Sequence, residues 1–410
     1  MSDGRWWHIY GPFDAGEDEL PHIGQVINHY RRLHGVKTRV LAETLTRMGW
    51  EVGERRMEQL QSDTNVSDPQ HISRRKLLMR ALAIPPILLG LSQAADGADL
   101  GELLSVPAIP RRARIGEDEL LRYDTILSSF WDSFYQSSVR RNADGIKRWR
   151  QHLEALAQDV DATHRPHVLT LLCRFDQLAA IEAREEADFA SAMRHHTQAV
   201  KIAQELDNAE LLAASLFRRA RTQLHQSQVD SAMEDMTLAV KNAQRARDNL
   251  KGYVFQMAGE VITRLPVSRD TTIQFNRYMD AAGRILRTGK IEEDGSGAYL
   301  TAAGYHQDRA RGYLRLGQND AALDEIQLAE KTSQPQMFRW QVELLTLRAK
   351  AYTQSGDPEW ACHEIEEALR LIQTTRSPLQ KRNIREVYTS LIDRYPGQLR
   401  VRQLTALVKA

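Results

Sequence analysis

A spacing of alanines recurs four times in this chain of 410 residues. In each set the second alanine follows the first by 12 residues, and the third follows the second by 7. The four sets are Ala180, Ala192 and Ala199; Ala220, Ala232 and Ala239; Ala310, Ala322 and Ala329; and Ala349, Ala361 and Ala368. Where two antiparallel helices cross most tightly, only a methyl group fits between them. A hairpin of two such helices cannot bury its own apolar face, so it stacks on the next hairpin and forms a solenoid.

The last two sets contain further residues that resemble the tetratricopeptide repeat (TPR) family. These are Tyr313 and Gly317 in one set and Tyr352 and Gly356 in the next. In that family the tyrosine packs between the helices and the glycine permits the turn that closes the first helix. The step from Ala220 to Ala310 is more than twice as long as the other two steps between sets, and it predicts an irregular hairpin at 251–265 and 271–286. The resemblance implies an all-α fold in which residues 117–410 form a TPR-like α-solenoid with terminal capping helices.

The charge of the N-terminal region differs from that of the whole chain. Residues 21–80 contain eleven lysines and arginines and six acidic residues, whereas the formal net charge of the chain is +1. Residues 1–20 are an acidic arm, with five acidic residues and one arginine. Apolar residues at helical spacing predict three helices between Ile23 and Leu60, and the basic stretch 73–91 predicts a fourth that ends at Pro85-Pro86. A small basic helical domain over residues 21–91 follows from these patterns.

This segment resembles a lambda-repressor-type (XRE-type) helix-turn-helix domain. The similar stretches are Ile23–Ile27 with Tyr30-Arg31-Arg32, and Val40–Leu45. Leu60 stands where members of that family usually have an aromatic residue. The resemblance implies a bacterial DNA-binding transcriptional regulator whose third helix enters the major groove.

On that interpretation the third helix supplies the base contacts. Arg55 and Arg56 can pair with guanine and Gln59 with adenine. Other basic residues would contact the phosphate backbone of double-stranded DNA: Arg31, Arg32, Lys37 and Arg39. The alternative is that Glu54 and Glu58 repel phosphates, that Arg55 and Arg56 pair locally with acidic residues, and that the domain instead docks a protein or forms a homodimer.

Residues 92–116 are predicted to be a linker, because prolines interrupt the helical pattern and a basic run, Arg111–Arg114, precedes Gly116. The stretch Arg74-Arg75-Lys76 with the apolar residues 81–91 imitates an export signal, but it is internal and too short to cross a bilayer. Cys173 and Cys362 are far apart and are expected to be buried thiols. We therefore expect a cytoplasmic protein without a membrane segment.

The resemblance to TPR proteins also predicts which residues face a ligand. In that family the first helix of each hairpin lines the concave face. The matching residues are Arg174, Gln177 and Arg184; Phe217, Arg221 and His225; Gln307, Arg311 and Arg315; and Lys350. Guanidinium groups bind carboxylates bidentately, which indicates an acidic peptide or partner segment. The alternative is that these side chains are simply solvated.

Motifs for catalysis are absent from the sequence. It contains no P-loop, no Gly-rich dinucleotide loop, no nucleophile elbow and no His-Glu-x-x-His motif. The neighbouring His195 and His196 would point about 100° apart on a helix. We expect no catalytic residue, no metal site and no cofactor. Two functions remain: a regulator whose solenoid binds a peptide or protein and modulates DNA binding, or an assembly scaffold whose N-terminal domain docks a protein or dimerises.

Overall fold

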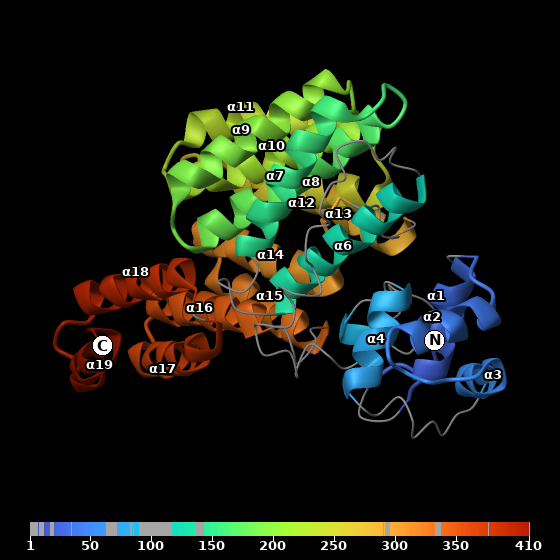
Figure 1. Ribbon diagram of the computed structural model, residues 1–410. Coiled ribbons are helices and arrows are strands. Elements are labelled where there is room, and N and C mark those ends of the chain that lie inside the picture. The colour runs from blue at the N-terminus through green and yellow to red at the C-terminus, as the bar shows by residue number, and fades with distance from the viewer. Residues whose placement is uncertain are drawn as a thin grey trace. The chain divides into compact units, whose positions relative to one another are not determined.

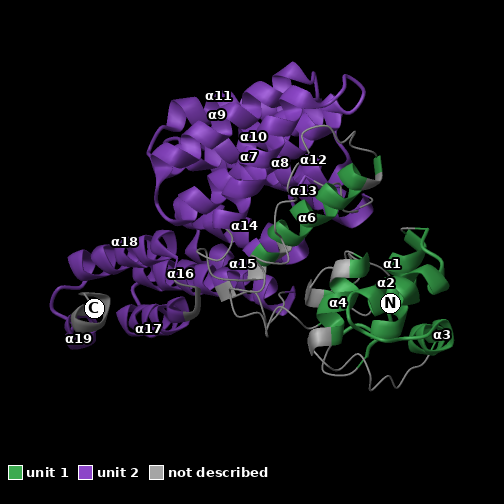
Figure 2. Ribbon diagram, in the orientation of Figure 1, with its two compact units in different colours: residues 1–133 green, residues 134–410 purple. Residues whose placement is uncertain are grey.

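The computed structural model of the protein describes most of the chain. The described residues are 7, 12–16, 20–33, 35–62, 72–82, 84, 86–89, 117–136, 143–289, 291, 296–332, 338–375 and 377–409. The chain forms two compact units, residues 1–133 and 134–410 (Figure 2). The boundary between them lies within α6 (Glu117–Gln136). The predicted linker, residues 92–116, lies outside the described residues.

Unit 1 is a small helical domain. Its N-terminal helices are α1 (Ile23–Leu33), α2 (Thr38–Arg47), α3 (Glu54–Ser62), α4 (Ile72–Leu82) and the 3-10 helix η3 (Pro86–Leu89). They share one apolar core, in which Leu60 is buried. Trp7 and Phe13, from the predicted acidic arm, belong to the same core, and the Trp7 indole donates to the Phe13 carbonyl at 2.9 Å. The arm is thus anchored to the domain by two aromatic side chains.

Unit 2 consists of helical hairpins. After α7 (Ala143–Asp159), five A helices alternate with five B helices (Figure 1). The A helices are α8 (Arg165–Glu185), α10 (Ala209–His225), α12 (Asp248–Ile262), α14 (Ala302–Arg315) and α16 (Phe338–Ser355). The B helices are α9 (Phe189–Glu205), α11 (Val229–Ala243), α13 (Arg269–Thr288), α15 (Asn319–Thr332) and α17 (Pro358–Thr375). Each A helix packs against the B helix that follows it, and the hairpins stack in sequence. The predicted all-α fold with a TPR-like α-solenoid is confirmed.

The alanine sets mark the crossings within four of these hairpins. The first alanine of each set lies on the A helix and the other two lie on the B helix, and all twelve have 0% exposure. The turn after each A helix contains a residue with positive φ seven positions beyond the first alanine: Ala187, Ser227, Gly317 and Gly356. Glycine adopts this conformation at the last two positions without strain. The first two turns have the same geometry without a glycine.

The irregular hairpin is α12 and α13, and a glycine takes the place of the alanine there. Gly259 follows Ala220 at the same interval at which Ala349 follows Ala310. A Cβ atom on Gly259 would be 2.7 Å from Met279 Sδ of α13. The next A helix makes a similarly close contact with α13, because a Cβ on Gly312 would be 2.2 Å from the Phe275 ring. Large side chains of α13 therefore fill space that alanines fill in the other hairpins.

The C-terminal helices close the solenoid. These are α18 (Pro378–Arg394) and α19 (Leu399–Lys409), at the two positions where capping helices are predicted. Helix α18 packs on α16 and α17 and also contacts α8, the first A helix. Ser377 Oγ donates to Glu185 Oε2 at 2.8 Å, and the Arg382 guanidinium lies 5.5 Å from the centre of the Phe189 ring. Helix α18 thus contacts the first hairpin, α8 and α9.

We predict that Gly312→Ala destabilises the solenoid by about 1–3 kcal/mol, because the new methyl group would overlap the Phe275 ring. Urea unfolding followed by circular dichroism measures this change. Gly304→Ala is the matched control in the same helix, since its Cβ would lie 3.2 Å from the Thr301 hydroxyl and meet no ring. Equal stability of the two variants would contradict the close packing of α13 on α14.

Candidate functional site

A cluster of positively charged side chains gathers at the C-terminal ends of the A helices. We call it the cationic cluster: Arg184 of α8, Arg221 of α10, Arg264 after α12, Arg311 and Arg315 of α14, and Lys350 of α16. The charges of these residues act on one another and on Glu260 of α12, which lies among them. Cations are favoured at helix C-termini, where the backbone carbonyls carry partial negative charge. Five A helices therefore contribute to one site.

The register of the A helices explains why these side chains meet, except for Arg184, which stands four positions after Ala180. Arg221, Arg311 and Lys350 each follow directly after the buried alanine of their helix, and Glu260 follows Gly259 in the same way. One turn later, at the fifth position after the small residue, stand His225, Arg264 and Arg315. Residues four apart lie on one face of a helix. Because the small residue faces the B helix in each hairpin, the two positions point in the same direction in successive A helices.

Glu260 is the central carboxylate of the cluster. Its oxygens lie 3.7 Å from Arg221 Nε, 3.7 Å from Arg311 Nη1 and 3.5 Å from Arg315 Nη2. Arg311 also pairs with Asp308 and Glu343. Burial alone would raise the pKa of Glu260, but the guanidiniums of Arg311 and Arg221 hold it well below its usual value. Glu260 is therefore ionised at neutral pH.

The side chains of three cations in the cluster make no hydrogen bond or ion pair with the described residues. These are Arg184, Arg264 and Lys350. The Arg184 side chain belongs to a residue that is only 7% exposed, and its Nε atom is buried without an acceptor. Arg264 Nε is buried in the same way. Buried charges are normally paired, because removing an ion from water is costly. These groups are the feature of unit 2 that most clearly indicates a ligand.

The pKa values of three groups in and beside the cluster reflect burial first and the neighbouring positive charge second. Burial, followed by the charges of Arg315 and Arg264, lowers the pKa of Lys350 to about 8. Burial and the neighbouring Arg184 lower the pKa of His225 to about 3, so this imidazole is neutral at physiological pH. Burial, with a smaller effect of Arg221, also lowers the pKa of Arg184 to about 10. A negatively charged ligand would relieve this repulsion.

The structure brings together six of the ten residues predicted to face a ligand: Arg184, Arg221, His225, Arg311, Arg315 and Lys350. The other four lie elsewhere. Gln177 is buried between helices, where it donates to Ser215 Oγ at 2.9 Å and accepts from Arg218. Phe217 packs in the apolar core 5.3 Å from the Tyr253 ring, and Gln307 is 5% exposed. Arg174 is ten residues before Arg184, or about 15 Å along α8.

The sequence-based prediction omitted Arg264 and Glu260. Both lie in the irregular hairpin, where no alanine set identifies the register. Gly259 is the signal that could have found them, because its interval from Ala220 equals the interval between Ala310 and Ala349. Counting from Gly259 gives Glu260 and Arg264 at the positions of Arg221 and His225.

In unit 1 the residues predicted to contact DNA differ in their surroundings. Arg55, Arg56 and Gln59 are exposed on α3, while Met57 and Leu60 of the same helix are buried. Arg56 donates to Gln59 Oε1 at 3.3 Å. Arg31 is half-buried and holds the fold together, because it donates to Gln61, Val36 and Asn28. Arg32 and Lys37 are exposed, and Arg39 pairs with Glu43 at 2.9 Å.

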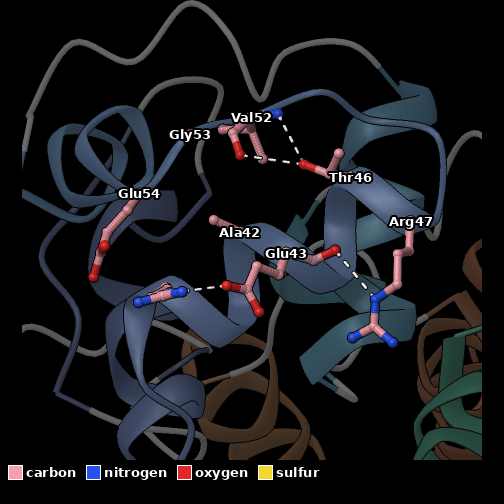
Figure 3. Close-up of a pocket in the computed structure, with 8 residues that line it drawn as sticks. Ala42, Glu43, Thr46, Arg47, Val52, Gly53 and Glu54 are labelled. Carbon is pink, nitrogen blue, oxygen red and sulfur yellow. Dashed lines mark hydrogen bonds and ion pairs between the residues drawn. The ribbon is translucent and has the colours of Figure 1, made fainter.

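An open pocket of about 530 Å³ lies between α2 and the start of α3 (Figure 3). Arg39, Glu43 and Arg47 of α2 line one side of it, and Val52, Gly53 and Glu54 line the other. The ion pair of Arg39 with Glu43 and the hydrogen bond of Arg47 Nε to the Glu43 carbonyl at 3.4 Å engage its charged groups. The pocket is therefore a depression between helices whose arginines already have protein partners.

Neighbouring histidines in unit 2 have separate partners. His195 Nδ1 lies 3.0 Å from Asp176 Oδ1, whereas His196 is fully buried beside Thr222 Oγ1 at 2.9 Å. In the part of the chain that the structure describes, no three His, Cys, Asp or Glu side chains are arranged to hold a metal ion. The described helices also include none that is both long and apolar enough to cross a membrane.

No protein-family model and no curated protein sequence matches the chain. Solved structures similar to it include the crystal structure of the APC/C hetero-tetramer Cut9–Hcn1, with 11% identity over 94% of this chain and 74% of that chain and a TM-score of 0.37. Another is the TPR domain of P58(IPK), with 14% identity over 93% of this chain and 98% of that chain and a TM-score of 0.20. At these scores the assignment of the fold rests on the helix pairing described above.

We predict that Lys350→Met raises the stability of the ligand-free protein at pH 7 by about 1–2 kcal/mol, because it removes a half-buried cation that lies among arginines. In the folded state the pKa of Lys350 is about 8, against 10.5 for an unperturbed lysine. Between these values the unfolded chain binds more protons, so this cost is fully present below pH 8 and disappears as the pH approaches 10.5.

The measurement is thermal unfolding of the wild type and Lys350→Met between pH 7 and pH 10. The difference between the two proteins isolates Lys350 from other groups that titrate in this range. Lys331→Met, at an exposed position of α15, is the control and should change little at any pH. A lower melting temperature of Lys350→Met at pH 7 would show that Lys350 has a stabilising partner.

Proposed function

We propose that the protein is a non-enzymatic interaction scaffold whose solenoid binds an acidic segment of a partner protein at the cationic cluster. The observation that carries this proposal is Arg184, a buried guanidinium that has no carboxylate partner among the described residues. Its neighbours Arg221 and Arg315 are partly exposed, with 25% and 15% of their side chains accessible, so the cluster can be reached from solvent.

Physical reasons support an acidic partner over an apolar one. Six cations face three carboxylates in the described part of the cluster: Glu260, Asp308 and Glu343. Two further carboxylates act on the cluster from its edge, where Glu185 accepts from Ser377 and Glu386 pairs with Arg382 at 3.0 Å. Such an excess of charge steers oppositely charged groups to the site and repels basic ones.

The test uses a fluorescent peptide of eight glutamates, with a peptide of eight lysines for comparison. We expect fluorescence anisotropy to show binding of the glutamate peptide at low salt and none of the lysine peptide. The double variant Arg184→Gln/Lys350→Gln should weaken binding about tenfold or more, through the loss of two charge-assisted contacts. Arg370→Gln, at an exposed position of α17, is the matched control. Equal affinity of the wild type and the double variant would overturn the proposal.

DNA binding by unit 1 is a second candidate function, which would make the protein a transcriptional regulator modulated by its solenoid ligand. The observation that favours it is the exposure of Arg55, Arg56 and Gln59 together on α3. Glu54 and Glu58 are exposed on the same helix and oppose phosphate contact. This balance supports the scaffold as the main proposal, with unit 1 as a docking or dimerisation module.

Salt dependence separates the two uses of unit 1. If α3 binds DNA, the affinity for a labelled random-sequence duplex should fall by orders of magnitude between 50 mM and 200 mM salt. Arg55→Ala/Arg56→Ala should then weaken binding about tenfold or more, while Arg370→Ala should not. Absence of duplex binding at 50 mM salt would exclude the DNA-binding function and direct the search to protein partners of unit 1.

A further inference from the structure

Three cations of the cluster lie around one carboxylate, Glu260. Arg221, Arg311 and Arg315 come from two different A helices, yet all three lie within 3.7 Å of the Glu260 oxygens. The charges of Arg315, Arg264 and Arg311 act on Lys350, and so does the carboxylate of Glu386 of α18. The return of α18 to α8 joins the two ends of this arrangement through Ser377 and Glu185. The cluster is therefore convergent.

Glu260 does not satisfy the guanidiniums that surround it. Charge-assisted hydrogen bonds between nitrogen and oxygen are about 2.7–2.9 Å long. The three contacts of Glu260 are 3.5 to 3.7 Å, and its Oε2 atom is buried without a hydrogen bond. Donors of Arg221 and Arg315 are consequently available to additional oxygens, whereas Arg311 already donates to Asp308 and Glu343.

The arrangement of the cations indicates whether the ligand is extended or compact. Carboxylates on one face of an extended peptide are about 6.6 Å apart, which suits a row of cations. A phosphoryl or diphosphate group carries several charged oxygens on one or two atoms, and the planar fork of arginine matches that geometry. Donors from α10 and α14 lie around one carboxylate, and Arg184 and Arg264 act on the same carboxylate; this arrangement fits the second shape.

We propose that the cationic cluster is a binding site for a compact polyanion of the phosphoryl or diphosphate class, anchored by Arg184, Arg264 and Lys350. The anion is either a phosphoryl group on the acidic partner segment or a free diphosphate. This inference shares one assumption with the proposed function, namely that the cluster is a binding site. Glu260 then holds Arg221, Arg311 and Arg315 in place around the anion.

The experiment is isothermal titration calorimetry on the full chain with four probes: inorganic pyrophosphate, sulfate, a phosphoserine peptide and the peptide of eight glutamates. We expect pyrophosphate to bind at least tenfold more tightly than sulfate. Arg184→Gln and Lys350→Met should each weaken pyrophosphate about tenfold or more, whereas Arg370→Gln should not. Lys350→Met is expected to fold well, so a loss of binding by this variant reports on the site itself.

The outcomes separate this inference from the proposed function. If the glutamate peptide binds and pyrophosphate does not, the compact polyanion is wrong and the acidic partner stands. If pyrophosphate binds and neither peptide binds, the cluster is a site for a free diphosphate and the proposal of an acidic partner is wrong. Tighter binding of the phosphoserine peptide than of pyrophosphate assigns the phosphoryl group to the partner. Equal pyrophosphate affinity in wild type, Arg184→Gln and Lys350→Met overturns the inference.

Discussion

The tight crossing of the two helices in each hairpin is the constraint on which the rest of unit 2 depends. A residue with 0% exposure at this crossing, such as Ala220 or Ala310, fixes how far the A helix is rotated about its axis. Once that rotation is fixed, the next residue and the one a turn later must point away from the B helix. The same small side chains that permit close packing therefore also aim the charged side chains of successive A helices at one region.

Apolar packing holds the charges of the cluster together against their repulsion. The hairpins bury large clusters of alanine, leucine and aromatic side chains, and this burial is the dominant favourable contribution to folding. Because the interior is densely packed, the cations of the cluster cannot move apart without disturbing the helices that hold them. Glu260 offsets part of the repulsion, whereas burial and, after it, the charges of Arg315 and Arg264 lower the pKa of Lys350.

The repeated hairpins could be predicted from the sequence because each contains a marker that depends only on local geometry. Alanine spacing indicated the crossings, and Gly317 and Gly356 indicated two of the turns. The site was predictable where such a marker fixed the register, as for Arg221 and Arg311, and unpredictable in α12, where Gly259 replaces the alanine. Gln177 and Phe217 were misplaced for a related reason: each lies three positions before the buried alanine of its helix, and there the side chain packs in the core between A helices. The burial of Trp7 and Phe13 depends on long-range contacts that no local pattern encodes.

Glu260 neutralises only part of the positive charge of the cluster, and this determines whether an anion would bind reversibly or permanently. A cluster of cations without any carboxylate would need a bound anion in order to fold, and the anion would then be a permanent part of the structure. A cluster fully matched by carboxylates would have no affinity left for a ligand. With Glu260, Asp308 and Glu343 among its six cations and Glu185 and Glu386 at its edge, the cluster has internal partners for part of its charge, while Arg184 and Arg264 keep donors for an incoming anion. That intermediate state favours reversible binding, as an interaction scaffold requires.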